Sequence, residues 1–417
     1  MHSLRTVALL AGSLAAIGSA NAGGYSRGTA DTDLIFEEGN FNMRAGVTIV
    51  MPQRGYETVT APTTTAPIPQ VIPAGTYSGT DSEYSQSYAI PSSAVKFNLS
   101  DDLRCAGTYT QPFGADSEYG PQAILVGAMA DGTGTSKEGF TTDEFGVTCG
   151  YKFDLAKGRA WVIGGGFLQD FNYSQTVQLP FGGLGQPLGS SATLSFKDDY
   201  QPGYRLGVAY EIPEIALRAQ LLYRSAVEHN PGGSSGDTFS IQTPDGPGPV
   251  FATTGQGTLP QSVELKLQSG IAPGWLAFGN VKWTDWSVLE TLDYTIIGIG
   301  DRELEYYYKD GWTVTGGIGH AFTEDISGVI GLTWDRGVST TEDALSDTYT
   351  LAAGVALKDT SRAVEVRFGG AVSYLTAASV SAQTSDSVGV YDPGASFGYS
   401  VGADWAYALS AGYKISW

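Results

Sequence analysis

The chain ends in "DWAYALSAGYKISW", residues 404–417, in which apolar and aromatic side chains occupy every second position. Small or polar residues such as Ser410 and Lys414 lie between them. A period of two predicts a β-strand, because successive side chains leave a strand on opposite faces. Aromatic residues at both ends, including Trp405 and Trp417, with aliphatic residues between them, are typical of a strand that crosses a lipid bilayer.

Composition favours strands and turns over helices. The 417 residues include 56 glycines and 12% aromatic residues, but only 16% charged residues. A basic residue, Arg5, an apolar run over residues 7–17 and small residues at 20–22 predict a secretory signal peptide over residues 1–22. The formal net charge of -20 makes nucleic acid an unsuitable partner.

After the first 22 residues, no stretch approaches 18 consecutive apolar residues, so the sequence predicts no transmembrane helix there. A chain that spans a membrane without helices has to close into a β-barrel, because the bilayer core offers no water to unpaired backbone groups. We therefore predict an all-β fold, a transmembrane antiparallel β-barrel of about 14 strands over residues 42–417.

The strand pattern supports this fold along the whole chain. Apolar alternation predicts strands at 43–51, 87–99, 102–113, 139–155, 159–172, 203–212, 215–228, 259–271, 275–288, 305–322, 326–337, 347–357, 362–375 and 401–417. Their connections are alternately long and short, as in barrels with long external loops and short periplasmic turns. The polar face of each strand then lines the lumen, where we expect the charges of Arg205, Arg218, Lys266 and Lys282.

Residues 23–41 precede the first strand and lack clean alternation. They are too polar to face lipid, so they either hang in the periplasm or enter the lumen, and we favour a hatch that plugs the lumen. The apolar members are expected to pack against the barrel wall rather than to contact a ligand. The hatch residues of interest are Ile35, Phe36, Glu37, Glu38, Asn40 and Phe41.

Several stretches resemble the FadL/TodX family of outer-membrane channels. They are "LSDDLRCAGTYTQPFG" at 99–114, "YQPGYRLGVAYEIPEIALRAQLLYRSAVEHN" at 200–230, "LPQSVELKLQSGIAPGWLAFGNVKWTDWS" at 259–287 and "YYKDGWTVTGGIGHAF" at 307–322. The resemblance implies a hatch-gated barrel for passive uptake of hydrophobic compounds, above all long-chain fatty acids, with a lateral exit and without cofactors. It also implies the outer membrane of Gram-negative bacteria, with lipid and lipopolysaccharide around a monomer. The chain departs from the family at "LIFEEGNF", where members usually carry Asn-Pro-Ala.

Two long loops carry apolar residues that are candidates for a ligand-binding groove. Exposed apolar patches commonly mark interaction sites. The alternative interpretation, that these side chains only pack the loops against each other, stays open. The candidates are Val177, Leu179, Phe181, Leu184, Leu188, Phe239, Ile241, Val250 and Phe251.

Cys105 and Cys149 are the two cysteines of the chain, and both take positions beside residues expected to face outward. They belong to neighbouring predicted strands, so a disulfide is one possibility in an oxidising periplasm. Two free apolar cysteines are the other.

Enzymatic activity is not expected. His2 leaves with the signal peptide, and neither His229 nor His320 has a serine two residues away, so the nucleophile and base of a lipase-type barrel are missing. We predict no catalytic residues and no metal site. A general diffusion porin for small polar solutes is the closest alternative, and a structural or adhesive barrel without any ligand is a third.

Overall fold

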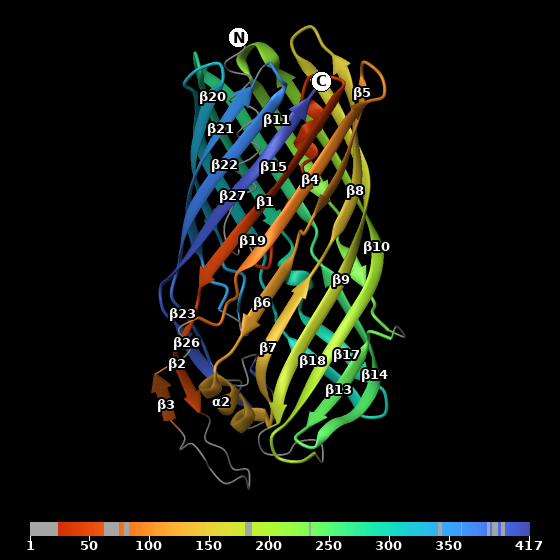
Figure 1. Ribbon diagram of the computed structural model, residues 1–417, viewed down its shortest axis with the longest axis vertical. Helices are drawn as coiled ribbons and strands as arrows, with labels where there is room; N and C mark the ends of the chain where they lie inside the picture. The colour runs from red at the N-terminus through yellow and green to blue at the C-terminus, as the bar shows by residue number, and fades with distance from the viewer. Residues whose placement is uncertain are drawn as a thin grey trace.

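In the described part of the chain, fourteen antiparallel strands close a barrel in the computed structural model (Figure 1). β1 pairs with both β4 and β27, and the register places Asn42 opposite Ser416, so the first and last wall strands close the ring. The structure describes residues 24–61, 75–78, 83–179, 186–232, 235–340, 344–359, 361–381, 384–385, 391–392 and 397–417. The predicted signal peptide therefore lies outside the described residues.

The wall follows chain order, with each strand hydrogen-bonded to the next. Its members are β1 (Phe41–Gln53), β4 (Tyr88–Asn98), β5 (Leu103–Thr110), β8 (Glu144–Asp154), β9 (Arg159–Leu179), β10 (Ser190–Ile212), β11 (Leu217–Arg224), β15 (Ser262–Ala272), β16 (Trp275–Thr284), β19 (Gly311–Ala321), β20 (Ile326–Asp335), β21 (Thr348–Asp359), β22 (Val364–Leu375) and β27 (Asp404–Ser416). The predicted barrel is thus confirmed, and the fourteen wall strands overlap the fourteen predicted ranges.

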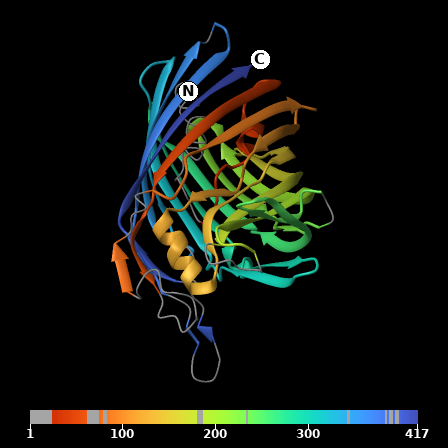
Figure 2. The same cartoon turned by 60° about the horizontal axis from the view of Figure 1, so that its bottom comes forward.

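The two ends of the barrel differ as the connection lengths predicted. One end carries tight turns, with the 3-10 helix η3 (Pro213–Ile215) among them. The other end carries nearly all of the remaining elements (Figure 2). They are β2 (Tyr56–Ala61), β3 (Gly75–Ser78), β6 (Gly114–Glu118), α2 (Pro121–Asp131), β7 (Gly134–Thr141), β12 (Val227–His229), β13 (Thr238–Thr243), β14 (Gly246–Leu259), η4 (Trp286–Val288), β17 (Thr291–Ile296), β18 (Gly300–Glu305), β23 (Ala378–Val380), β24 (Thr384–Ser385), β25 (Tyr391–Asp392) and β26 (Gly398–Val401).

The helix α2 was not foreseen from the sequence. Its first residue is Pro121, whose missing N–H costs nothing at a helix start. It ends at Gly132, which has a φ of 89° and caps the helix in the left-handed conformation. Local capping therefore sets the bounds of this helix within a long connection. No helix among the described residues is long and apolar enough to cross a membrane.

A second departure concerns the hairpin of β9 and β10. The sequence predicted a loop over residues 173–202, but these strands continue to Leu179 and from Ser190. A β-bulge between Asp198 and Gln201 shifts the register of β10 against β9. The bulge reverses which face the even-numbered residues occupy, so Phe196 is 1% exposed whereas Tyr200 is 46% exposed. This reversal hid the strand from a period-two search.

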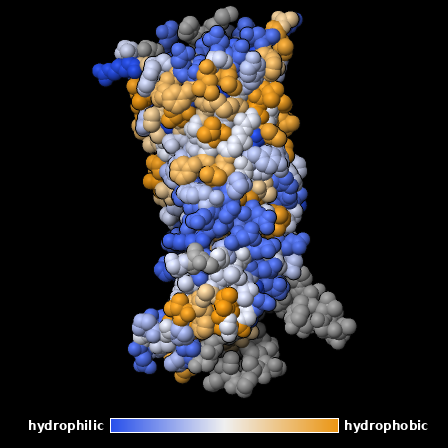
Figure 3. Space-filling model, turned by 90° about the vertical axis from the view of Figure 1, so that its right-hand side faces the viewer, coloured by the Kyte–Doolittle hydropathy of each residue, from blue (hydrophilic) through white to orange (hydrophobic). Residues whose placement is uncertain are grey.

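Side chains along each wall strand point alternately to an apolar outer face and to a polar lumen. In β27 the outward Leu409 is 60% exposed and the inward Lys414 is 7% exposed. Figure 3 shows apolar side chains gathered around the part of the barrel nearest the tight turns, with a more polar zone beyond it. A barrel that crosses a bilayer has this pattern.

Aromatic residues form a row across neighbouring strands at one border of the apolar zone. The register pairs Trp283 with Trp312, and it pairs Trp334, Tyr349, Tyr374 and Trp405 in succession across β20, β21, β22 and β27. Such girdles anchor barrels at the membrane interface. This row is consistent with our interpretation of the tryptophans as interfacial anchors.

Candidate functional site

The N-terminal segment, residues 24–40, lies inside the barrel and reaches both sides of its lumen. The buried carboxylate of Asp33, in the 3-10 helix η1 (Thr32–Phe36), lies 3.3 Å from Lys266 of β15 and 3.5 Å from Arg218 of β11. Glu37 forms ion pairs with Arg44 of β1 and with Lys414 of β27, the latter at 2.7 Å. Because β15 stands seven strands away from β1 in the ring of fourteen, these contacts span the lumen.

The apolar members of the N-terminal segment pack against the wall. Ile35 is fully buried, and the Phe36 ring meets the Trp161 ring edge-on with centroids 5.3 Å apart. Glu38 and Asn40 are exposed near the tight turns. Phe41 is the first residue of β1 rather than part of the plug, and its ring stacks on Trp417.

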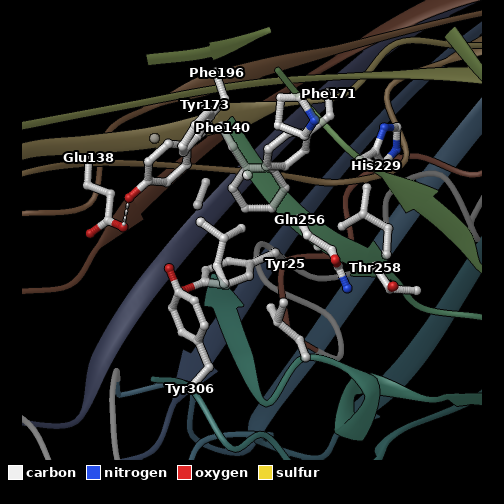
Figure 4. A pocket seen from close by; sticks show the side chains of 18 of the residues that line it. Tyr25, Glu138, Phe140, Phe171, Tyr173, Phe196, His229, Gln256, Thr258 and Tyr306 are labelled. Carbon is white, nitrogen blue, oxygen red and sulfur yellow. Dashed lines mark hydrogen bonds between the residues drawn. The ribbon is translucent and has the colours of Figure 1, made fainter. Parts of the chain in front are cut away.

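An aromatic cavity lies between the N-terminal segment and the elements at the long-connection end (Figure 4). It holds about 860 Å³ of space free of protein atoms, part of which is open to solvent. Its walls come from β6, β7, β9, β10, β12, β14, η4 and β17, which pack into one apolar cluster here. The aromatic lining residues are Tyr25, Tyr119, Phe140, Phe171, Tyr173, Phe196, Trp286 and Tyr306.

Few polar groups interrupt this lining. The Tyr173 hydroxyl donates a hydrogen bond of 2.8 Å to the Glu138 carboxylate. On the other side of the cavity lies His229, whose Nδ1 is 2.8 Å from the Asp198 carboxylate. Burial lowers the pKa of His229, against the opposing effect of Asp198, so this imidazole is neutral at pH 7. No lysine or arginine is among the described residues that line the cavity.

Two arginines of the lumen wall share one carboxylate. Arg205 and Arg224 both pair with the buried carboxylate of Glu144. Both guanidinium groups also lie over the ring of Phe167, each 4.5 Å from its centroid. These contacts hold the positive charges in the lumen wall, in agreement with the predicted lumenal position of Arg205.

The β4–β5 hydrogen-bond ladder is interrupted along one short stretch of the wall, which we call the seam. The β4–β5 ladder ends at the pair Ser92 and Thr110, and an isolated bridge joins Ser85 to Ser117 in the same register. Between these points, the described backbone shows one cross-strand bond, from Gln86 N to Asp116 O. The sequence explains the interruption. If the ladder continued in the same register, the next hydrogen bond would need a backbone N–H at residue 112, which is a proline and has none.

The N-terminal segment takes up the backbone groups that the seam leaves free. Arg27 N donates to Pro112 O and Gly28 N donates to Gln111 O, each at 2.8 Å. Gly114 N in turn donates to Tyr25 O at 3.0 Å. The strand that leaves β5 therefore bends toward the plug instead of pairing with β4.

The family model of outer membrane protein transport proteins (OMPP1/FadL/TodX) matches residues 41–414. The chain belongs to this family. Membership makes it an outer-membrane transport channel for hydrophobic compounds, and the resemblance noted from the sequence is confirmed. In this family's barrel, the tight turns face the periplasm and the long connections face the cell exterior.

Solved structures of the FadL/TodX fold share the architecture at low sequence identity. A Pseudomonas aeruginosa FadL homologue superposes with a TM-score of 0.67 at 14% identity, over 90% of each chain. The P. putida toluene transporter TodX gives 0.59 at 15% identity, over 92% of each chain. The CymD monoaromatic hydrocarbon channel gives 0.54 at 11% identity, over 92% of this chain and 90% of that one. A comparison with curated protein sequences finds no match.

The predicted groove residues that the structure describes in this FadL/TodX protein do not line the aromatic cavity. Leu179, Phe239 and Ile241 are buried in the apolar cluster behind it, and Val177 and Phe251 pack against that cluster. Leu188 and Val250 are 70% and 65% exposed. Phe181 and Leu184 lie outside the described residues. The structure thus groups most of them in the extracellular packing and leaves two on the surface.

A disulfide joins the two cysteines. Cys105 of β5 and Cys149 of β8 stand directly opposite each other, with a Cα–Cα distance of 4.0 Å. This bond ties β5 to the strand on its far side, away from the seam. Parity alone placed the cysteines on one face, but the register was needed to bring them together.

Sequence reasoning missed the cavity because its lining comes from separate chain segments. Tyr25, Phe140 and Trp286 stand alone in their segments, without an apolar pattern that links them. His229 was considered only as a catalytic or metal-binding residue. Its neighbour Asp198 precedes the bulge, where the alternation breaks. Among the described residues, no cluster of histidine, cysteine and carboxylate side chains could hold a metal ion.

Proposed function

We propose that hydrophobic compounds enter the aromatic cavity from the cell exterior, that the N-terminal segment is the hatch, and that the seam is the lateral exit into the outer membrane. Transport of this kind is passive. Burial of apolar surface, worth about 25 cal/mol per Å², supplies the affinity without any catalytic group.

The observation that carries this proposal is the position of Tyr25. Its ring lines the cavity and meets the Phe140 ring edge-on, with centroids 5.3 Å apart. Its backbone carbonyl accepts the hydrogen bond from Gly114, at the seam. One residue of the hatch thus contacts both the binding site and the exit. A ligand that displaces the Tyr25 ring would also loosen the seam.

The chemistry of the cavity favours an uncharged aromatic cargo over the long-chain fatty acid expected from the sequence resemblance. A buried carboxylate needs a cation or several hydrogen-bond donors to offset its lost hydration. The lining offers one carboxylate, Glu138, and no lysine or arginine among its described residues. Aromatic walls instead suit edge-to-face packing with a ligand ring. The TodX and CymD structures named above are those of channels for toluene and monoaromatic hydrocarbons, which supports this choice.

The general porin remains the alternative function. A porin requires a lumen open to water and ions, whereas residues 24–40 bridge this lumen through the ion pairs of Asp33 and Glu37. The charged lumen wall suits either function, so the plug is the feature that separates them.

The test reconstitutes the full mature protein and a variant that lacks residues 23–40. Binding of toluene and of oleate would be measured alongside planar-bilayer conductance. Saturable toluene binding with a low conductance that rises on deletion would support the proposal. Saturable binding of oleate but not of toluene would indicate that the cargo is a fatty acid. High conductance of the intact protein with binding of neither compound would favour the porin.

A further inference from the structure

Two fully buried side chains of the aromatic cavity each carry a hydrogen-bonding nitrogen without a partner among the described residues, Trp286 Nε1 and His229 Nε2. His229 is 2% exposed and lines the cavity, and its Nε2 has no hydrogen-bond partner among the described residues. Its ring packs on Phe171, with centroids 5.5 Å apart. Buried polar atoms in folded proteins are nearly always paired, so this unpaired nitrogen requires a partner, which a bound molecule that reaches it would supply.

Asp198 determines which proton the imidazole carries. A carboxylate only accepts hydrogen bonds, so the 2.8 Å contact between Asp198 Oδ2 and His229 Nδ1 requires the proton to be on Nδ1. Asp198 Oδ1 is held by Gln201, whose side-chain nitrogen donates to it at 3.2 Å. The β-bulge between these two residues brings both groups together at this point of β10.

The remaining nitrogen is therefore a hydrogen-bond acceptor. Burial lowers the pKa of His229, and the nearby Arg224 lowers it further, which outweighs the pull of Asp198 toward the charged form. A neutral imidazole with its proton on Nδ1 presents a lone pair at Nε2. A toluene-like hydrocarbon has no donor for that lone pair.

We propose that His229 Nε2 accepts a hydrogen bond from the hydroxyl group of a phenol whose ring and apolar substituent fill the aromatic cavity. The inference rests on the proposed uptake function and narrows its cargo. The acceptor selects ligands with an O–H group, the lack of lysine and arginine in the described lining disfavours anions, and the aromatic walls pack against the ligand ring. Figure 4 shows His229, Gln256 and Thr258 along one side of the cavity. These polar side chains face a largely aromatic wall.

The first experiment compares three ligands of nearly equal shape on the reconstituted full-length mature protein by isothermal titration calorimetry. They are 4-butylphenol, 4-butylanisole, in which a methyl ether replaces the hydroxyl, and butylbenzene. We expect 4-butylphenol to bind about three- to tenfold more tightly than the other two, which is the usual effect of one neutral hydrogen bond. Equal affinities after correction for partition into detergent would overturn the inference. Equal affinities would also result if a bound water molecule already donated a hydrogen bond to His229 Nε2.

The second experiment reverses the polarity of the acceptor. In Asp198→Asn, Gln201 holds the amide oxygen in the place of Oδ1, which turns the amide nitrogen toward His229 Nδ1. That nitrogen donates, so the proton of the imidazole moves to Nε2, which becomes a donor. We expect Asp198→Asn to prefer 4-butylanisole over butylbenzene and to lose its preference for the phenol. A merely structural role of Asp198 would change all three affinities alike and would contradict the inference.

The variant His229→Phe provides the matched control. It keeps an aromatic ring against Phe171 but lacks any acceptor, so 4-butylphenol should bind like butylbenzene. A retained preference for the phenol would overturn the assignment to His229. The outcomes also separate the two proposals. If all three ligands bind equally, hydrophobic uptake stands without phenol selection, and if none binds, the uptake function itself fails.

Discussion

Asp33 and Lys266 lie 3.3 Å apart, carboxylate to ammonium, although Asp33 belongs to the N-terminal segment and Lys266 to a strand on the far side of the ring from β1. This ion pair closes a bridge across the lumen that begins at Glu37 and Lys414. The N-terminal segment is therefore held at two opposite points of the wall, by charges rather than by apolar packing alone.

The Asp33→Asn variant should loosen the hatch. It leaves Lys266 and Arg218 without their shared buried anion, and the loss of one partner of a buried pair costs about 3 kcal/mol. We expect a higher and noisier conductance in planar bilayers. The exposed turn variant Asp359→Asn removes the charge that pairs with Arg362 and keeps an oxygen for the turn bonds from Ser361, so it is the matched control and should behave like the wild type. An unchanged conductance in Asp33→Asn would argue against gating by this contact.

The Pro112→Val variant should close the seam. It restores a backbone N–H at the position where the β4–β5 ladder would next need a donor, so release of a hydrophobic ligand into the bilayer should slow. The measurement is transfer of naphthalene from the protein to labelled liposomes. In Pro91→Val, the added N–H points toward β1, and transfer should stay at the wild-type rate. Equal rates in both variants would exclude the seam as the exit.

The Phe140→Ala variant should weaken ligand binding. Phe140 contributes its ring to the cavity wall beside Tyr25, and truncation removes apolar contact worth about 1.5 to 3 kcal/mol. A loss of about tenfold or more in toluene affinity is therefore expected. Leu188→Ala, at an exposed position of the predicted loop groove, tests the competing location. If Leu188→Ala lost the affinity and Phe140→Ala kept it, the ligand would bind in the groove and not in the cavity.

Removal of the disulfide should destabilise the barrel. The bond between Cys105 and Cys149 closes a loop with a sequence separation of 44, for which chain-entropy arguments give about 2 to 4 kcal/mol. The double variant Cys105→Ser/Cys149→Ser should thus unfold at a lower temperature, followed by heat-dependent migration on gels. Reductant should lower the unfolding temperature of the wild type and leave the double variant unchanged. Free thiols in the denatured wild type would show that the bond does not form.

The fourteen strands could be predicted because a barrel wall repeats one rule at every position, with lipid on one side and lumen on the other. The rule fails where the backbone slips. At Asp198 and Gln201 the bulge exchanges the faces, and the strand beyond it appeared to be a loop. Capping at Pro121 and Gly132 likewise produced a helix that no alternation could reveal.

The cavity could not be predicted for a different reason. Tyr25, Phe140 and Trp286 become neighbours only because the hatch enters the barrel and the extracellular elements fold over it. The apolar loop residues that were visible in the sequence, such as Phe239 and Ile241, serve in the packing behind that surface. None of these residues, taken alone in the sequence, indicates that it lines a cavity.

The pairing between the two chain segments has the same register on both sides of the seam. Ser92 faces Thr110 on one side, and Ser85 faces Ser117 on the other. No strand has to slide for the wall to part or to rejoin, so the shear number and circumference of the barrel stay constant. Backbone groups of residues 111, 112 and 114 in the wall instead form hydrogen bonds with residues 25–28 of the N-terminal segment. Release of a molecule through the proposed exit would therefore leave the perimeter of the barrel, and its fit to the surrounding bilayer, unchanged.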